Sequence, residues 1–161
     1  MSEIIVIAHN IRSTHNIGSI FRTCEGFGVK KLIISGYSPY PKAPNDSRLP
    51  HIYNKLTEQI HKTALGAENM VPFCYQPQPD FDKIHDDGYS IVGLEQDDSS
   101  IVLNKFNKPA KIALLLGEEV HGITADLINQ CDYLVEIPMQ GKKESFNVSV
   151  ATGIALYGLT I

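Results

Sequence analysis

Near the start of the chain, a predicted helix carries Asn16, Gly18 and Arg22, and the arginine is a candidate phosphate ligand. The segment Asn16–Phe27 is typical of an amphipathic helix. Its apolar face carries Ile17, Ile20, Phe21, Cys24 and Phe27. Arg22 falls on the opposite face, one turn from Gly18, which exposes backbone because it has no side chain. A planar guanidinium held over a cleft can grip a phosphate. The alternative interpretation is a solvated arginine on an amphipathic helix.

A second segment, Leu114–Ile123, joins a predicted buried strand to a pair of acidic residues. The strand runs into Gly117, then Glu118 and Glu119, and a second glycine precedes the next helix. Loops at the carboxyl ends of strands are where open α/β sheets bind ligands. The alternative is an ordinary turn with both carboxylates in solvent.

A third segment, Ile137–Ser149, breaks a strand at Pro138 and leads through a glycine-containing loop into an apolar helix. Ser145 stands where that helix begins and is a candidate N-cap. Asn147 places an amide at the start of an otherwise apolar helix, where a buried polar group needs a partner.

The elements that position these segments alternate between short strands and helices. The predicted strands are continuous β-branched runs, as expected for strands buried on both faces: Ile4–Ala8, Leu32–Ser35, Val71–Tyr75, Ile91–Leu94, Ile112–Leu116 and Tyr133–Ile137. Further helices are predicted over Asn54–Leu65 and over Thr124–Asn129, with Thr124 as N-cap, and the proline-rich stretch Ser38–Pro50 is predicted as an exposed loop. The alternation predicts a single α/β domain with a mainly parallel sheet flanked by helices.

The last predicted helix, Phe146–Ile161, is apolar around nearly its whole circumference. Such a helix must be buried on more than one side. Burial in the centre of one chain and burial at an interface between subunits both satisfy this pattern.

The composition is that of an ordinary globular domain of 161 residues, 43% of them hydrophobic and 20% charged. It excludes a disordered chain, a collagen-like repeat and a disulfide scaffold. Three cysteines without CxxC spacing indicate reduced thiols, and six histidines show no metal-ligand spacing, so we expect no metal. The net charge of −4 counts against a nucleic-acid binder, although a local basic patch can sit on an acidic protein.

Neither end of the chain indicates export or membrane insertion. Met1–Ala8 has no basic leader and no long apolar run. The longest uncharged segment, Ser145–Ile161, is shorter than a membrane span and contains polar residues. We therefore expect a cytoplasmic protein with no membrane partner.

Taken in order, the three segments resemble the motifs of the SpoU (TrmH-like) branch of the SPOUT RNA methyltransferases. The first motif of that family, N-x-G-x-x-x-R, is matched by Asn16, Gly18 and Arg22. The second, G-x-E-x-x-G-[IL], is matched by residues 117–123, and the third, I-P-M-x-G-x-x-x-S-[LF]-N-V-S, by residues 137–149. Residues 62–68 resemble the middle segment of the family, so the resemblance spans nearly the whole chain.

The resemblance implies a fold, a cofactor and an assembly. The fold is an α/β domain with a deep trefoil knot in its C-terminal region. The implied cofactor is S-adenosylmethionine, with matching positions around it at Leu94, Gly117, Ile137, Met139, Ser145 and Phe146. Family members are homodimers with active sites at the interface, which agrees with the apolar last helix. The resemblance covers residues 1–161 as one SpoU-type methyltransferase domain, with no appended RNA-recognition domain expected.

The implied reaction is methyl transfer to a ribose 2′-hydroxyl of RNA, with transfer RNA the first choice of substrate and ribosomal RNA the second. By resemblance Arg22 is catalytic. The resemblance implies that Arg22 helps to deprotonate the ribose. Because a guanidinium is a poor base, an RNA phosphate bound by Arg22 is the alternative proton acceptor, and both possibilities stay open at this point. Asn16, Ser145 and Asn147 would hold Arg22, the phosphate or the ribose, and Glu119 would order the knot loops by accepting backbone N–H bonds.

Two other functions stay open. The chain can be a non-catalytic α/β module that binds S-adenosylmethionine or a nucleotide without methylating RNA. It can also be an enzyme of the same superfamily that methylates a base nitrogen instead of the ribose.

Overall fold

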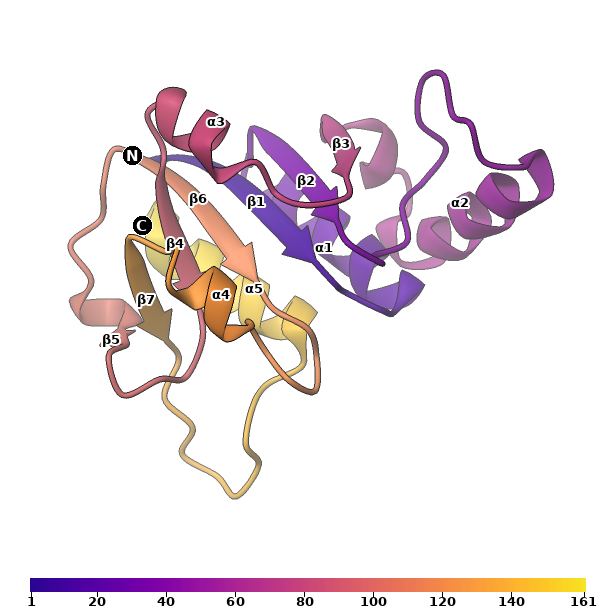
Figure 1. Ribbon diagram of the computed structural model, residues 1–161. Coiled ribbons are helices and arrows are strands. Elements are labelled where there is room, and N and C mark those ends of the chain that lie inside the picture. The colour runs from indigo at the N-terminus through magenta and orange to yellow at the C-terminus, as the bar shows by residue number, and fades with distance from the viewer.

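The computed structural model describes all residues, Met1–Ile161, and its centre is a seven-stranded parallel sheet. The strand order across the sheet is β3-β2-β1-β6-β4-β7-β5 (Figure 1). The strands are β1 Glu3–His9, β2 Lys31–Ser35, β3 Phe73–Gln76, β4 Ser90–Leu94, β5 Ile101–Val102, β6 Lys111–Leu116 and β7 Tyr133–Glu136. The prediction of a mainly parallel α/β sheet is confirmed. The edge strand β5 was not predicted, because two residues are too few to show a periodicity.

Three helices cover one face of the sheet and two cover the other (Figure 1). On the first face lie α1 Thr14–Gly26, α2 Pro50–Ala64 and α5 Val148–Thr160, and on the second lie α3 Phe81–Asp86 and α4 Ala125–Ile128. Single 3₁₀ turns follow α2 and β5, namely η1 Ala67–Asn69 and η2 Leu103–Lys105. The prediction missed α3, which is short and lies in an acidic segment.

The central strands β1, β2, β4 and β6 are nearly continuously apolar because they bury both of their faces. Val6 of β1 lies opposite Leu32 in β2 and Leu114 in β6, and all three pack toward α1, α2 and α5. The neighbouring residue, Ile7, points the other way and packs in the layer that α3 and α4 cover. Leu32 and Leu114 are fully buried.

The helix boundaries correct several details of the sequence prediction. Helix α2 starts at Pro50, four residues before the predicted start, because a proline suits the first turn of a helix. Helix α4 is shorter than predicted, and Thr124 occupies its N-cap position without a side-chain hydrogen bond. Helix α5 begins at Val148, not Phe146, and its cap is Asn147 instead of Ser145.

Gly18 is buried, so the expectation that it exposes backbone is wrong. A Cβ at this position would overlap Thr63 Oγ1 and the carbonyl oxygen of Ile60 on α2. Thr63 Oγ1 also donates to the carbonyl of His15 at 2.8 Å. The glycine therefore lets α1 and α2 approach closely, and this contact joins the first motif to the Lys62–Glu68 segment.

No helix in this structure combines the length and apolar character that crossing a bilayer requires. The trefoil knot in the C-terminal region stays a prediction of the family resemblance.

Candidate active site

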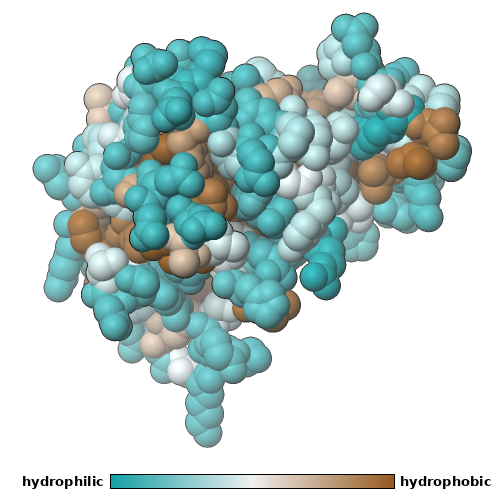
Figure 2. Space-filling view, viewed as in Figure 1, coloured by the Kyte–Doolittle hydropathy of each residue, from teal (hydrophilic) through white to brown (hydrophobic).

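A cavity of about 300 Å³ opens at the carboxyl ends of β4, β6 and β7. Three loops and the first turn of α5 form its walls, and the longest loop, after β7, projects beyond the sheet (Figure 1). This hydrophilic projection is the teal tip of the space-filling view (Figure 2). The lining residues are Leu94, Glu95, Gln96, Leu116, Gly117, Glu118, Glu119, Val120, His121, Gly122, Glu136, Ile137, Glu144, Ser145, Phe146, Val148 and Ala151. The cavity thus lies where open α/β sheets bind ligands.

Five of the six residues predicted to surround a cofactor line this cavity: Leu94, Gly117, Ile137, Ser145 and Phe146. The sixth, Met139, is half-buried and stands outside the cavity walls. The apolar members of the wall supply surface for a flat or aliphatic ligand group, as in most small-molecule sites.

The loop after β6 is a tight hairpin closed by two backbone hydrogen bonds. The N–H of Glu118 donates to the carbonyl of Gly122 at 3.1 Å, and the N–H of Gly122 donates back at 2.8 Å. Gly122 adopts a φ of +68°, which favours glycine. A Cβ on Gly117 would lie 2.5 Å from Ile123 N. The two glycines of the second motif are therefore required by the backbone path at the cavity wall.

Glu95, at the end of β4, holds this hairpin in place and was missed by the sequence analysis. Its Oε2 accepts from Ile123 N at 2.7 Å, and its Oε1 accepts from Gln96 N at 3.0 Å. A Cβ on Gly122 would overlap Glu95 Oε2. An acidic residue after a strand is common, so no pattern in the sequence marked Glu95 for this role.

The Glu119 side chain extends from the loop after β6 to the start of α1 and accepts hydrogen bonds there. Its Oε1 accepts from Asn16 Nδ2 at 3.1 Å and from Ser13 N at 3.4 Å, and its Oε2 accepts from Arg12 N at 3.3 Å. Burial raises the pKa of the carboxyl, but these hydrogen bonds outweigh it and lower the pKa below its ordinary value. Glu119 thus accepts backbone N–H bonds from the β1–α1 loop, where the prediction had placed them in the knot loops.

Asn147 is the partner that joins α5 to this group. Its Oδ1 accepts from Ser149 N at 2.9 Å and from Val150 N at 3.4 Å, which caps the helix. Its Nδ2 donates to Asn16 Oδ1 at 3.2 Å. Glu119, Asn16 and Asn147 therefore form one hydrogen-bonded chain that joins all three sequence motifs beside the cavity.

Arg22 does not belong to the hydrogen-bonded group of Glu119, Asn16 and Asn147. It is exposed, and six residues along α1 from Asn16 correspond to a rise of about 9 Å. It borders a shallow hollow shared with Gly153, Ile154 and Tyr157 of α5. The side chains of Arg22 and Ser145 make no hydrogen bond or ion pair within the protein. Within one subunit, the Arg22 side chain is therefore not in contact with Ser145, Asn16 or Asn147.

The cavity wall is strongly acidic. Its ionisable members are five glutamates and one histidine, with no lysine or arginine: Glu95, Glu118, Glu119, Glu136, Glu144 and His121. Such a wall favours a ligand that carries positive charge. No three His, Cys, Asp or Glu side chains converge in a way that would hold a metal ion.

The fold and the cavity define an α/β domain with a cavity of small-ligand size at the carboxyl edge of a parallel sheet. Residues 3–157 match the SpoU rRNA Methylase family, and the chain belongs to this family. The family resemblance seen in the three motifs is therefore confirmed.

Two curated relatives show how far the similarity extends. A mouse protein named tRNA (guanosine(18)-2′-O)-methyltransferase TARBP1 is 31% identical over 160 residues, which are 99% of this chain and 9% of the relative. The 23S rRNA (guanosine-2′-O-)-methyltransferase RlmB of Coxiella burnetii is 31% identical over 156 residues, 96% of this chain and 56% of the relative. The chain thus spans about half of one relative and under a tenth of the other.

Solved structures share the fold over the whole chain. A TrmH/SpoU tRNA modifying enzyme from A. aeolicus superposes with a TM-score of 0.79 at 25% identity, covering 99% of this chain and 75% of that one. An AdoMet-bound rRNA methyltransferase from Sinorhizobium meliloti gives a TM-score of 0.78 at 23% identity and covers 98% and 55% of the two chains. The second likeness concerns the fold alone.

Proposed function

We propose that the chain is an S-adenosylmethionine-dependent RNA methyltransferase that acts on a ribose 2′-hydroxyl. The main support for this proposal is the hydrogen-bond network of Glu119, Asn16 and Asn147. This network joins the three motifs of the family beside the cavity. The names of the mouse and Coxiella relatives support the same reaction type.

The cavity fits the cofactor in size and charge. Its volume of about 300 Å³ is at the lower end of small-ligand sites. When bound, S-adenosylmethionine supplies an activated methyl group on a positively charged sulfonium. Leu94, Ile137 and Phe146 offer apolar surface to it, and the surrounding glutamates match its positive charge. The chain between Gly117 and Gly122 is held rigidly by its own hydrogen bonds, so this wall is formed before binding.

The acceptor hydroxyl is a poor nucleophile until its proton is removed, so orientation and deprotonation supply most of the catalysis. We assign phosphate binding to Arg22, whose guanidinium is exposed and without an internal partner. A phosphate held there accepts the proton of the hydroxyl, because the guanidinium itself stays protonated. Ser145, whose hydroxyl faces no internal partner and which lines the cavity, is assigned to the ribose.

We infer that two copies assemble through the outer face of α5. The inner face packs into the core through Ala155, Leu156 and Leu159. On the outer face Val150, Tyr157 and Ile161 are 50%, 59% and 74% exposed, at spacings that align them along the helix. The core of one subunit thus covers only one side of this apolar helix. The other side remains exposed and is available for a second subunit.

The same assembly resolves the position of Arg22, which borders Ile154 and Tyr157 on this exposed face. A second copy packed there brings Arg22 of one subunit toward the cavity of its partner. Tyr157→Asp places a charge in the contact and is expected to give monomers in analytical ultracentrifugation, with transfer activity lost. Glu25→Gln, on an exposed part of α1, is the control that should leave the dimer unchanged. A monomeric wild-type protein with full activity would contradict the assembly.

We propose a cytoplasmic location, which the three unpaired cysteines support because free thiols are typical of a reducing compartment. Transfer RNA is the first proposed substrate and ribosomal RNA the second. The test is tritiated methyl transfer from S-adenosylmethionine to total transfer RNA and, separately, to ribosomal RNA, both from a strain that lacks this gene. Label in one pool supports the enzyme and names its substrate class. Cofactor binding by calorimetry without label in either pool favours a non-catalytic binding module.

A further inference from the structure

Positive and negative residues are distributed unevenly along the sequence. In the folded protein this gives two surfaces of opposite net charge. Residues 1–65 hold eight Lys and Arg against four Asp and Glu, a net charge of +4. Residues 66–161 hold six against fourteen, a net charge of −8. The first part supplies β1, β2, α1 and α2, and the second supplies α3, α4 and the acidic cavity. The protein is therefore acidic overall but carries a positive region.

The positive region lies on the side of the sheet that α1 and α2 cover. Lys55 and Lys62 are exposed and seven residues apart, which places them on one face of α2. Arg22 on the adjacent α1 is exposed as well. None of the three forms an ion pair, whereas Lys83 on α3 is bound to Asp87 at 3.1 Å. These three cations without ion pairs therefore lie on two neighbouring helices.

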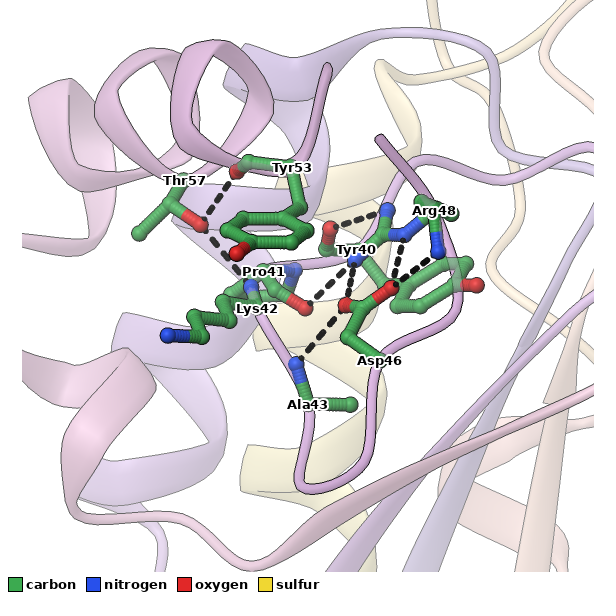
Figure 3. Close-up of polar contacts among 8 residues, drawn as sticks. All are labelled: Tyr40, Pro41, Lys42, Ala43, Asp46, Arg48, Tyr53 and Thr57. Carbon is green, nitrogen blue, oxygen red and sulfur yellow. Dashed lines mark hydrogen bonds and ion pairs between the residues drawn. The ribbon is translucent and has the colours of Figure 1, made fainter. Parts of the chain in front are cut away.

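The loop that precedes α2 extends this face and is held in one conformation (Figure 3). Arg48 donates to Asp46 through Nε at 2.9 Å and through Nη2 at 2.6 Å, and to the carbonyls of Tyr40 and Pro41 at 3.0 and 3.1 Å. Its guanidinium also lies 3.5 Å from the centroid of the Tyr40 ring, which is stacked on Tyr75. The Arg48 guanidinium is therefore already hydrogen-bonded within the protein and is not free to contact a phosphate.

Lys42, in the same loop, contacts α2 instead. The N–H of Lys42 donates to Thr57 Oγ1 at 2.8 Å, and its ammonium lies 5.1 Å from the centroid of the Tyr53 ring, both on α2 (Figure 3). Lys42 is exposed and has no ion pair. A cation held this way loses little conformational freedom when it meets a phosphate.

The opposite face repels a polyanion. Asp80, Asp82, Asp86 and Asp87 lie on or beside α3, and Asp126 and Asp132 lie on and after α4. The surface over α3 is hydrophilic (Figure 2). A phosphate backbone that approaches the molecule is therefore steered toward α2 and away from α3.

We propose that the face of α2 and its preceding loop, with Lys42, Lys55 and Lys62 as phosphate contacts, is the docking surface for the RNA substrate. The proposal rests on the function proposed above and adds the surface that binds the RNA outside the cavity. Arg22, assigned to an RNA phosphate, lies on α1, which packs directly beside α2. Glu58 stands between Lys55 and Lys62 on the same helix face and opposes binding.

The test compares two double variants with the same change in net charge. Lys55→Glu with Lys62→Glu alters the proposed surface, and Lys83→Glu with Lys105→Glu alters exposed lysines elsewhere. The probe is end-labelled total transfer RNA from a strain that lacks this gene, with its dissociation constant measured from 50 to 200 mM salt. S-adenosylmethionine binding by calorimetry checks that each variant is folded.

The α2 double variant is expected to bind RNA about 25-fold to 60-fold more weakly at 0.1 M salt, with a salt slope smaller by about two. The control variant is expected to change affinity less than about threefold, and Glu58→Gln is expected to tighten binding. Equal losses in both double variants, or a loss in neither, would overturn the surface. Methyl transfer by the wild type is scored separately. RNA binding that depends on α2 without any transfer would therefore keep the surface and reject the enzyme.

Discussion

The hydrogen-bonded chain from Glu119 to Asn147 predicts a specific cost for removing one charge. In Glu119→Gln the side chain keeps its shape but one oxygen becomes an NH₂ group. That group then faces Arg12 N or the pair of donors Ser13 N and Asn16 Nδ2, and donors cannot bond to donors. The variant therefore loses at least one of the three hydrogen bonds and the charge that strengthens the others.

The size of the loss follows from the geometry. Hydrogen bonds to charged groups contribute about 1.5–3 kcal/mol each. The bonds from Arg12 N and Ser13 N are 3.3 and 3.4 Å long and the first is exposed, so water replaces much of their contribution. The bond from Asn16 Nδ2 is shorter at 3.1 Å and part-buried. We expect a decrease of about 1.5–3 kcal/mol in the free energy of unfolding.

The dependence on pH gives an independent check. The fold lowers the pKa of Glu119, so its stabilising contribution is present above the ordinary carboxyl pKa and is lost as pH falls through the lowered value. The difference between wild type and Glu119→Gln should therefore be full at pH 7 and shrink toward pH 3.

Urea unfolding at several pH values measures both effects, with Glu118→Gln as the matched control. The neighbouring carboxylate has only a 3.8 Å contact with an exposed Arg12 guanidinium, so its change should cost less than about 0.5 kcal/mol. Equal losses for the two variants, or a loss for Glu119→Gln that does not vary with pH, would refute the reasoning.

Three further variants test other parts of the structure. Arg22→Ala should keep calorimetric binding of S-adenosylmethionine within about twofold and reduce methyl transfer by at least about 100-fold, and undiminished transfer would reject its catalytic assignment. Gly122→Ala should lower the free energy of unfolding by about 1–3 kcal/mol because of its φ of +68°, whereas Gly141→Ala, with open space around it, should change little. Asp46→Asn should expose the bond after Arg48 to trypsin, and unchanged digestion would show that this ion pair does not order the loop.

Local pattern was sufficient to predict most of the fold. Six strands were found from their short apolar runs, and the central ones were the clearest because a strand buried on both faces is apolar at nearly every position. Helix α1 was found because its apolar residues recur with helical period. Helix α3 and strand β5 were missed because six and two residues are too short for either period to be seen.

The site was predicted as segments, and its connections were not. The bond from Asn16 to Glu119 spans 103 residues and that from Asn147 to Asn16 spans 131, so no local pattern can report either one. The interpretation of Gly18 failed for the same reason, since the residues it contacts, Ile60 and Thr63, lie more than forty residues away in the sequence. Glu95 acts on a hairpin 28 residues further along the chain. Tertiary structure supplied what spacing could not.

The most direct test of the central claim is where the methyl group lands. RNA labelled by this protein with tritiated S-adenosylmethionine is digested with alkali or nuclease, and the labelled products are separated. Transfer to a ribose 2′-hydroxyl protects the next phosphodiester, so the label should appear in a resistant dinucleotide. Label released entirely as modified mononucleotide would place the methyl on a base and contradict ribose methylation.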